Sequence, residues 1–431
     1  MLNKKTKRRK KMKKKTLQKF SRLFASLVLV GAMSLGTVAP VNAAAAGEWN
    51  YGDTPRAALT VEYTMGQGVT VPDSSFKFNF APTTAPEGMQ KQNMPSISAQ
   101  TVKFTNSDTY TENGTTKIYK KESNNFLEDF STALTMNADL VTGKYVYIVT
   151  QAPLTNGQST INFANKDTDN AVLSTKNYVV SIYVAQDTTT KNLYIKGIGV
   201  QEADKSGNPI GNKIDATPGT DTGKYSEMVF SNKLNAYAGG GSSSTPDPSD
   251  DTTYAFLVSY KEVTGDGSKQ SDKTFKYTLS VEAPNFISGS ETYELYTYKN
   301  GTATKLGDVA YGAEKTDITL DVGESILVKK CYAGSVAKVT ETGKANWLAS
   351  ASAQFNETSA TVSTVKRGAD LLVTGTIGQK KNAVEYTNDY RDIAVTGIIV
   401  NNFPFVMMIV MAMAAFVAIV AVKSRRRMNE R

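Results

Sequence analysis

Residues 177–200 read NYVVSIYVAQDTTTKNLYIKGIGV, and this stretch decides the fold. The segments Asn177–Ala185 and Lys191–Val200 alternate apolar and polar residues or run β-branched and aromatic ones, which is typical of β-strands. No long stretch of the chain has convincing helical periodicity. The sequence therefore predicts an all-β protein. The same strand pattern recurs in KYVYIV (144–149), YELYTYK (293–299), DITL (317–320) and SILVKK (325–330).

Turn and linker residues divide this strand-rich chain. Asn-Gly pairs at Asn113, Asn156 and Asn300 predict tight turns between strands. The stretch AGGGSSSTPDPSDD, rich in Gly and Ser and then in Pro and Asp, is typical of a linker. Many short strands with regular turns predict β-sandwich modules. We expect an N-terminal module at 47–237 with long inserted loops, a linker at 238–252 and a second module at 253–391.

The N-terminus has the composition of a secretory signal peptide. Residues 1–22 carry 12 Lys/Arg and no acidic residue, and a short apolar run and a small-residue exit ending at Ala43 follow. We predict a signal peptide at 1–43. An uncleaved anchor helix is the alternative, and Gly31, Gly36 and Pro40 disfavour it because they interrupt the apolar run.

The net charge of +9 comes from the two ends of the chain. Residues 423–431 carry five Lys/Arg and one Glu, so the remainder of the chain has 32 basic and 39 acidic residues. The body of the chain is therefore acidic, so the net positive charge is no evidence for nucleic-acid binding. The chain has no histidine and a single cysteine, Cys331, which excludes His-based zinc sites, Ser-His-Asp catalysis and an internal disulfide. We expect no enzyme, no metal and no cofactor.

The second module resembles a known domain. Its strands FLVSYKEVTGDG, KTFKYTLSVEA, DITLDVGESILVKKCYAGSVAKVTETG and AVEYTNDY are similar to the isopeptide-linkage domain of T-antigen-type backbone pilins of Gram-positive bacteria. The resemblance implies Ig-like, CnaB-type sandwiches. It also implies a bond between a first-strand Lys and a last-strand Asn, catalysed by a middle-strand Glu. Transferred to this chain, these residues are Lys261, Asn388 and Glu341.

Elementary chemistry supports such a bond. Burial disfavours charged forms, so it lowers the pKa of a lysine and raises that of a glutamic acid. A neutral amine can then attack the Asn carbonyl while the protonated Glu polarises it, and ammonia leaves. The alternative is that Lys261 and Glu341 form a surface ion pair or no interaction, which is usual for these residue types.

The first module departs from the family pattern. Its opening strand ALTVEYTMG has Tyr63 where the lysine is expected, and YIVTQAP has Gln151 where the glutamate is expected. Only Asn232, in MVFSNKL, remains in place. We therefore predict no such bond here, although Lys77 or Lys103 offers an amine elsewhere in the module.

The C-terminal stretch resembles a sorting signal. IAVTG, which comprises Ile393, Ala394, Val395, Thr396 and Gly397, is similar to the Leu-Pro-x-Thr-Gly motif of sortase substrates, with Ala394 in place of proline. An apolar segment at 398–422, which we predict to be a transmembrane helix, and a basic cytoplasmic tail at 423–431 follow. We expect a sortase to cut after Thr396 and pass its acyl group to an amine. A permanent single-pass anchor is the alternative.

The family implies a structural role at the cell surface. It predicts a major pilin joined head to tail through Thr396 and a lysine of the next subunit, for which Lys224 is the candidate and Lys213 and Lys233 are alternatives. The implied partners are identical subunits, a sortase, peptidoglycan and accessory pilins. The implied location is the cell wall, after transient retention in the membrane. A wall-anchored adhesin or stalk displayed singly is the alternative function.

Overall fold

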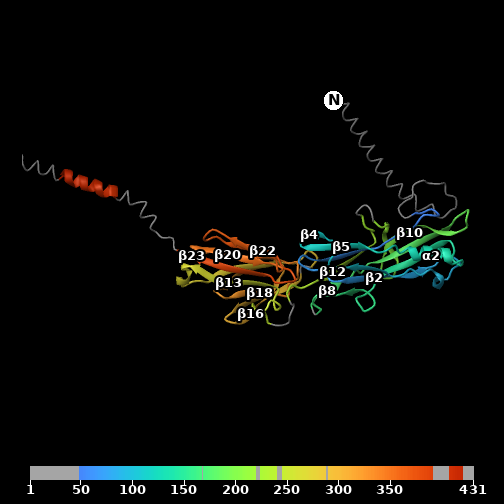
Figure 1. The fold of residues 1–431 in the computed structure, drawn as a ribbon, viewed down its shortest axis with the longest axis horizontal. Helices are drawn as coiled ribbons and strands as arrows, with labels where there is room; N and C mark the ends of the chain where they lie inside the picture. The colour runs from blue at the N-terminus through green and yellow to red at the C-terminus, as the bar shows by residue number, and fades with distance from the viewer. Residues whose placement is uncertain are drawn as a thin grey trace, which may run out of the picture.

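The structure is a computed structural model, and it describes residues 48–166, 168–219, 224–239, 245–287, 290–391 and 407–420. Two groups of β-strands lie end to end along an elongated body (Figure 1). The all-β prediction is confirmed, since each group consists of two sheets that enclose buried apolar side chains. The predicted signal peptide at 1–43, sorting motif and basic tail lie outside the described residues.

Module one contains a five-stranded sheet in the order β4-β5-β1-β12-β8 and a second sheet in the order β11-β10-β9-β6-β2-β3, with β7 paired to β2. A short helix, α2 (Glu128–Met136), and a 3-10 turn, η2 (Lys91–Asn93), interrupt the strands. The strands are β1 (Thr60–Gly66), β2 (Ser74–Thr84), β3 (Gln100–Phe104), β4 (Thr111–Asn113), β5 (Thr116–Glu122), β6 (Gly143–Gln151), β7 (Thr160–Ile161), β8 (Asn170–Val172), β9 (Asn177–Gln186), β10 (Leu193–Ala203), β11 (Pro209–Ile214) and β12 (Val229–Asn235).

Module two contains a seven-stranded sheet in the order β16-β15-β18-β13-β23-β20-β21 and a four-stranded sheet in the order β17-β14-β19-β22. One 3-10 turn, η3 (Asp266–Lys269), follows its first strand. The strands are β13 (Phe256–Gly265), β14 (Phe275–Glu282), β15 (Thr292–Lys299), β16 (Thr302–Ala310), β17 (Glu314–Leu320), β18 (Ser325–Lys329), β19 (Val336–Glu341), β20 (Trp347–Gln354), β21 (Thr361–Thr364), β22 (Leu371–Thr376) and β23 (Ala383–Tyr390).

In each module the first and last strands are parallel neighbours. β1 pairs with β12, and β13 pairs with β23. β1 and β12 run toward the junction between the modules, whereas β13 and β23 run away from it. The entrance to module one and the exit from module two therefore lie at opposite ends of the body (Figure 1).

Local sequence patterns explain several strands and turns of the structure. The alternating segment at 177–185 lies in β9, and 191–200 lies largely in β10. At the β15–β16 turn, Asn300 and Gly301 both have positive φ, at 50° and 76°. Two successive residues in this region form the turn that matches the twist of a hairpin, which explains the Asn-Gly pair.

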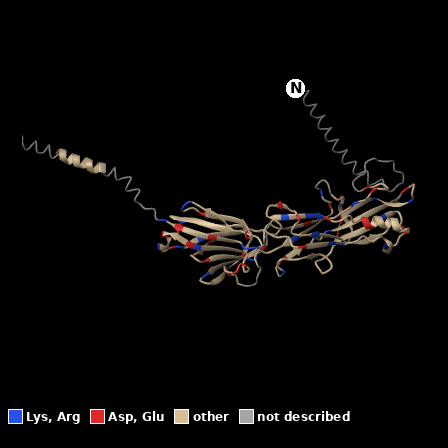
Figure 2. Ribbon diagram, in the orientation of Figure 1, with Lys and Arg blue, Asp and Glu red and all other residues tan. Residues whose placement is uncertain are grey.

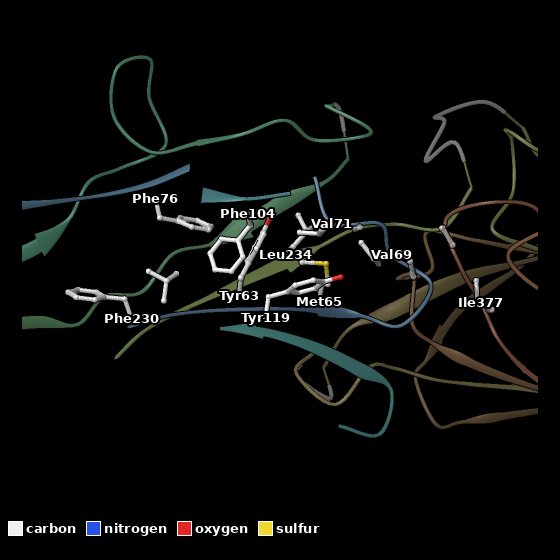
Figure 3. Packing of buried hydrophobic residues seen from close by; sticks show 14 of the residues in the cluster. Tyr63, Met65, Val69, Val71, Phe76, Phe104, Tyr119, Phe230, Leu234 and Ile377 are labelled. Atoms are coloured by element: carbon white, nitrogen blue, oxygen red, sulfur yellow. The ribbon is translucent and has the colours of Figure 1, made fainter. Parts of the chain in front are cut away.

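The junction between the modules is closely packed. Buried side chains of both modules form one continuous hydrophobic cluster, and Figure 3 shows Val69 and Val71 of module one lying toward Ile377 of module two. Tyr237 stacks on Tyr332 with ring centroids 4.4 Å apart, and the Tyr237 hydroxyl donates a hydrogen bond to the Tyr332 hydroxyl at 3.0 Å.

Glycines allow the backbones of the modules to touch at this junction. A Cβ atom on Gly66 would lie 2.0 Å from the carbonyl oxygen of Ala333, and one on Gly334 would lie 2.5 Å from the Gly66 Cα. Backbone hydrogen bonds cross the same place, from Ala238 N–H to the Cys331 carbonyl and from Ala333 N–H to the Ala236 carbonyl, each at 2.8 Å. The backbones of the two modules are therefore in direct contact at this junction.

Acidic and basic residues are interspersed along the strands and loops of both modules (Figure 2). Residues 407–420 form a helix within the predicted membrane segment at 398–422. None of the helices in the described ranges has the length and hydropathy needed to cross a bilayer.

Candidate functional site

The buried polar site of module two consists of Glu341 and Asn388, which face each other between its two sheets. Along β19, Ala337 and Val339 alternate inward with Glu341, and along β23 Tyr386 alternates inward with Asn388. The period of two thus directs both polar side chains into the core. Glu341 and Asn388 are completely buried.

Hydrogen bonds connect these two residues directly. The Asn388 Nδ2 donates to Glu341 Oε2 at 3.1 Å, and the Tyr277 hydroxyl donates to the same oxygen at 2.6 Å. Burial raises the pKa of Glu341 from 4.5 to about 7, because desolvation of the carboxylate outweighs the two hydrogen bonds, which lower the pKa. The structure thus brings two of the three predicted residues together, with a carboxyl that titrates near neutrality.

Lys261 does not join them. Its ammonium bonds Glu385 Oε2 at 2.9 Å on the surface, and its side chain is 61% exposed. That hydrogen bond raises the pKa of Lys261, so the amine is protonated and is not a nucleophile. The position beside Asn388 belongs to Tyr260, which is completely buried. The structure therefore brings Glu341 and Asn388 together and places the Lys261 amine on the surface, with Tyr260 at the position predicted for the lysine.

A β-bulge causes this displacement. In the β13–β23 ladder, Tyr260 pairs with Tyr386 and Glu262 pairs with Thr387, so Lys261 is an extra residue without a partner position. The inward side chains before the bulge are Phe256, Val258 and Tyr260, all fully buried. Strand alternation from Phe256 onward was the signal that could have identified Tyr260.

The site has unused hydrogen-bonding capacity. Among the described residues, Glu341 Oε1, Asn388 Oδ1 and the Tyr260 hydroxyl have no hydrogen-bond partner. Burial raises the pKa of Tyr260 further above its ordinary value, so its hydroxyl is neutral. The site thus holds the protonatable carboxyl of Glu341 against the carboxamide of Asn388, as the acid–base step of amide exchange requires. The third group is the phenol of Tyr260, whereas amide exchange requires an amine.

Module one repeats the arrangement with neutral groups. Tyr63 on β1 pairs in register with Asn232 on β12, and the Gln151 Nε2 donates to Asn232 Oδ1 at 2.8 Å. The Tyr63 hydroxyl, Gln151 Oε1 and Asn232 Nδ2 have no hydrogen-bond partner in the described parts of the chain. Both modules thus place a buried tyrosine beside the last-strand asparagine, which sequence reasoning recognised only in module one.

Lys224 lies five residues before β12, at the end of that strand that points away from module two. Its side chain is exposed, and hydrogen bonds of Ser226 fix the backbone that follows it. The Ser226 N–H donates to Glu122 Oε1 at 2.6 Å, and the Ser226 hydroxyl donates to the Ala58 carbonyl at 2.7 Å. A Cβ atom on Gly219 would lie 1.1 Å from the Lys224 carbonyl oxygen, so the two chain segments meet there.

The other predicted residues are placed differently. Lys213 lies exposed on the edge strand β11, and Lys233 lies exposed near the junction end of β12. Residues 393–397, with Thr396, lie outside the described residues. The described part of module two ends at Arg391, one residue after β23, at the end of the body where Figure 1 labels β23.

Metal coordination has no support in the described ranges, where no cluster of three or more Cys, Asp or Glu side chains could hold an ion. Cys331 is fully buried, and burial raises the pKa of its thiol to about 11. This pKa keeps the sulfur in its unreactive thiol form near neutral pH.

The chain matches one family model and several solved structures. Residues 257–390 match a family model described as "Domain of unknown function (DUF7601)", and no curated protein matches the chain. A solved structure of the major pilin from Streptococcus pyogenes is 18% identical, covering 78% of this chain and 99% of that chain at a TM-score of 0.29. The major pilin T3.2 from the same organism is 17% identical, with coverages of 78% and 98% and a TM-score of 0.29. The pilus-presented adhesin Spy0125 (Cpa) is 10% identical, with coverages of 78% and 100% and a TM-score of 0.23.

Proposed function

We propose that this chain is the shaft subunit of a pilus whose copies are joined covalently, head to tail, on a Gram-positive cell surface. The observation that carries the proposal is that Lys224 and the end of the described chain lie on different modules. Lys224 is exposed in module one, before β12, and the chain that leads to Thr396 leaves module two after Arg391, at the end of β23 that points away from module one. A link between two different sites on each copy repeats without closing, so it builds a fibre.

The linking reaction exchanges one amide for another. A sortase thiol attacks the Thr396 carbonyl, the Thr396–Gly397 bond breaks, and the segment from Gly397 onward leaves as an amine. The neutral Lys224 amine then attacks the thioester, the thiol leaves, and an amide joins the two copies. The final subunit is transferred in the same way to peptidoglycan.

This proposal does not require an internal crosslink. We infer that module two is closed by the hydrogen bonds of Tyr277 and Asn388 to Glu341, because the Lys261 ammonium bonds Glu385 on the surface instead of entering this site. The mass of the chain after removal of its signal peptide should then show no loss of ammonia. A deficit of one ammonia that disappears in Glu341→Ala would contradict this inference.

Multimers on cells test the proposed function. The full chain, displayed by a Gram-positive host with a pilus sortase, should give a ladder of bands that survives boiling in detergent. Lys224→Ala should reduce the ladder to a single wall-linked band, whereas Lys213→Ala and Lys233→Ala should leave it intact. Peptides from the unmodified ladder should contain a Thr396–Lys224 junction.

The second candidate function is an adhesin that is displayed as single copies on the wall. The size of module one and its lack of a predicted crosslink, with Tyr63 and Gln151 in place of the lysine and the glutamate, favour it. A single wall-linked band from the unmodified chain would support the adhesin and contradict the shaft subunit.

A further inference from the structure

A cavity of about 660 Å³ lies in module one between the segment that precedes β1, the end of β5 and α2, close to the Lys224 backbone. Glu122 lines it and at the same time accepts the hydrogen bond from Ser226 N–H, two residues beyond Lys224. Two residues span at most roughly 7 Å of chain, so the Lys224 backbone lies at the cavity rim. Its size falls within the range of sites that bind small ligands and short peptide segments. Other lining residues are Asp53, Pro55, Arg56, Asn125 and Glu128.

The cavity carries unpaired charges of both signs. Arg56, which precedes β1, and Glu128, the first residue of α2, are both exposed. Neither has an ion-pair partner among the described residues, and they do not pair with each other. Free charges of opposite sign on two different elements can orient a segment that carries both signs.

We propose that this cavity binds the C-terminal segment of a second copy of the chain, residues 391–396. The proposal rests on the proposed head-to-tail function and names the surface that aligns the two copies. The segment reads RDIAVT, so Arg391 and Asp392 are neighbours of opposite charge at its start. Arg391 is 73% exposed, and within its own copy its guanidinium pairs with Asp389 at 3.3 Å. On docking, Arg391 exchanges this pair for Glu128 of the other copy, while Asp392 pairs with Arg56.

The length of the segment suits this placement. Thr396 is five residues beyond Arg391, so an extended segment covers at most about 17 Å. The Thr396 carbonyl must lie next to the Lys224 amine when the amide forms. A segment that begins at the charged cavity wall and ends at the rim meets both conditions, because the cavity adjoins the Lys224 backbone.

A charge exchange between copies tests the proposal. The full chain is displayed with a pilus sortase, and the ratio of multimer to monomer is measured for Glu128→Arg, for Arg391→Glu and for both together. Exposed ion pairs of this kind change an equilibrium by about two- to fivefold. Each single variant should lower the ratio by that factor, and the double variant should restore it. Glu314 is an exposed glutamate on β17 of module two, outside the cavity lining, so Glu314→Arg is the matched control and should leave the ratio unchanged.

A second measurement tests peptide binding to the cavity independently of polymer formation. A labelled peptide with the sequence of residues 391–396, amidated at its C-terminus, is titrated against the purified full chain and its Lys224→Ala and Glu128→Arg variants. Binding should persist in Lys224→Ala and weaken in Glu128→Arg. Peptide binding without any ladder would refute the shaft function and retain the cavity. A normal ladder in Glu128→Arg, or a double variant that is not restored, would overturn the cavity proposal.

Discussion

Glu341 gives module two a stability that depends on pH, and the dependence can be calculated. Its pKa is raised from 4.5 to about 7 in the folded chain, so the folded state binds the proton more tightly than the unfolded state. The stabilisation by this proton is complete below pH 4.5, declines between the two pKa values and is lost above pH 7. A shift of this size corresponds to about 3 kcal/mol, at 1.36 kcal/mol for each pKa unit.

Glu341→Gln removes the titrating group and keeps the shape of the side chain. Its amide oxygen can still accept the hydrogen bond from Tyr277, and Gln151 already fills the corresponding position of module one against Asn232. We therefore expect the variant to be more stable than the unmodified protein at pH 8 by about 3 kcal/mol and similar to it at pH 4. The difference should grow steadily between these values.

Urea unfolding followed by tryptophan fluorescence measures this difference. The chain has two tryptophans, Trp49 and Trp347, and Trp347 is buried in module two against Phe275 and Tyr390. In a Trp49→Phe background the signal reports module two alone. A difference between Glu341→Gln and its parent that is the same at pH 4 and pH 8 would refute the reasoning. So would a parent that gains stability relative to the variant as the pH rises.

Two further predictions concern the tyrosine at the site and the glycine at the junction. Tyr260→Lys places an amine beside Asn388 and Glu341, so this variant should lose one ammonia on folding by intact mass; Tyr63→Lys, which faces Gln151 instead of a glutamate, should keep its full mass. A folded Tyr260→Lys chain of full mass would contradict this chemistry. Gly66→Ala puts a methyl group 2.0 Å from the Ala333 carbonyl oxygen, so it should cost about 1–3 kcal/mol of stability in urea unfolding. Gly199→Ala is the control for steric contact, because the atom nearest to the added Cβ atom lies at 3.7 Å, an ordinary van der Waals distance, and an equal loss in both variants would exclude contact as the cause.

Local patterns predicted most of the fold because most strands here obey local rules. Asn177–Ala185 alternates over nine residues, so β9 was evident, and the Asn300-Gly301 pair specified its hairpin turn. The bulge at Lys261 could not be seen in the same way. It depends on how β13 meets β23, two strands separated by the whole module, and one extra residue reverses every inward and outward assignment after it.

The site shows the same limit. Glu341 and Asn388 were predicted from a resemblance, and strand alternation places both in the core. The resemblance gives the role of the crosslinking amine to Lys261, the only lysine in FLVSYKEVTG. Strand alternation from the inward residues Phe256 and Val258 instead places Tyr260 in the core. The junction glycines were not predicted, because contact between Gly66 and Ala333 joins residues more than 250 positions apart.

The proposed linkage has a mechanical consequence that differs between the modules. In a polymer joined through Lys224 and Thr396, force enters directly before β12 and passes along that single strand to the junction. β1 and the rest of module one lie outside this path. In module two, force enters at the start of β13 and leaves at the end of β23. These strands are parallel, so their ladder, from the Leu257–Ala383 pair to the Gly265–Tyr390 pair, is sheared as a unit.

Single-molecule pulling with two attachment points tests this path. A chain held at Lys224 and Thr396 should lengthen in one step, by about 450 Å at roughly 3.3–3.6 Å per residue of module two. The same chain held at residue 48 and Thr396 should show a second, larger step, because β1 and β12 are then pulled apart. Asn232→Ala, which weakens only module one, should change the second step and leave the first unaltered. If module one also unfolds when the chain is held at Lys224, then tension does not follow β12 alone, and the asparagine site of module one contributes to the strength of the fibre.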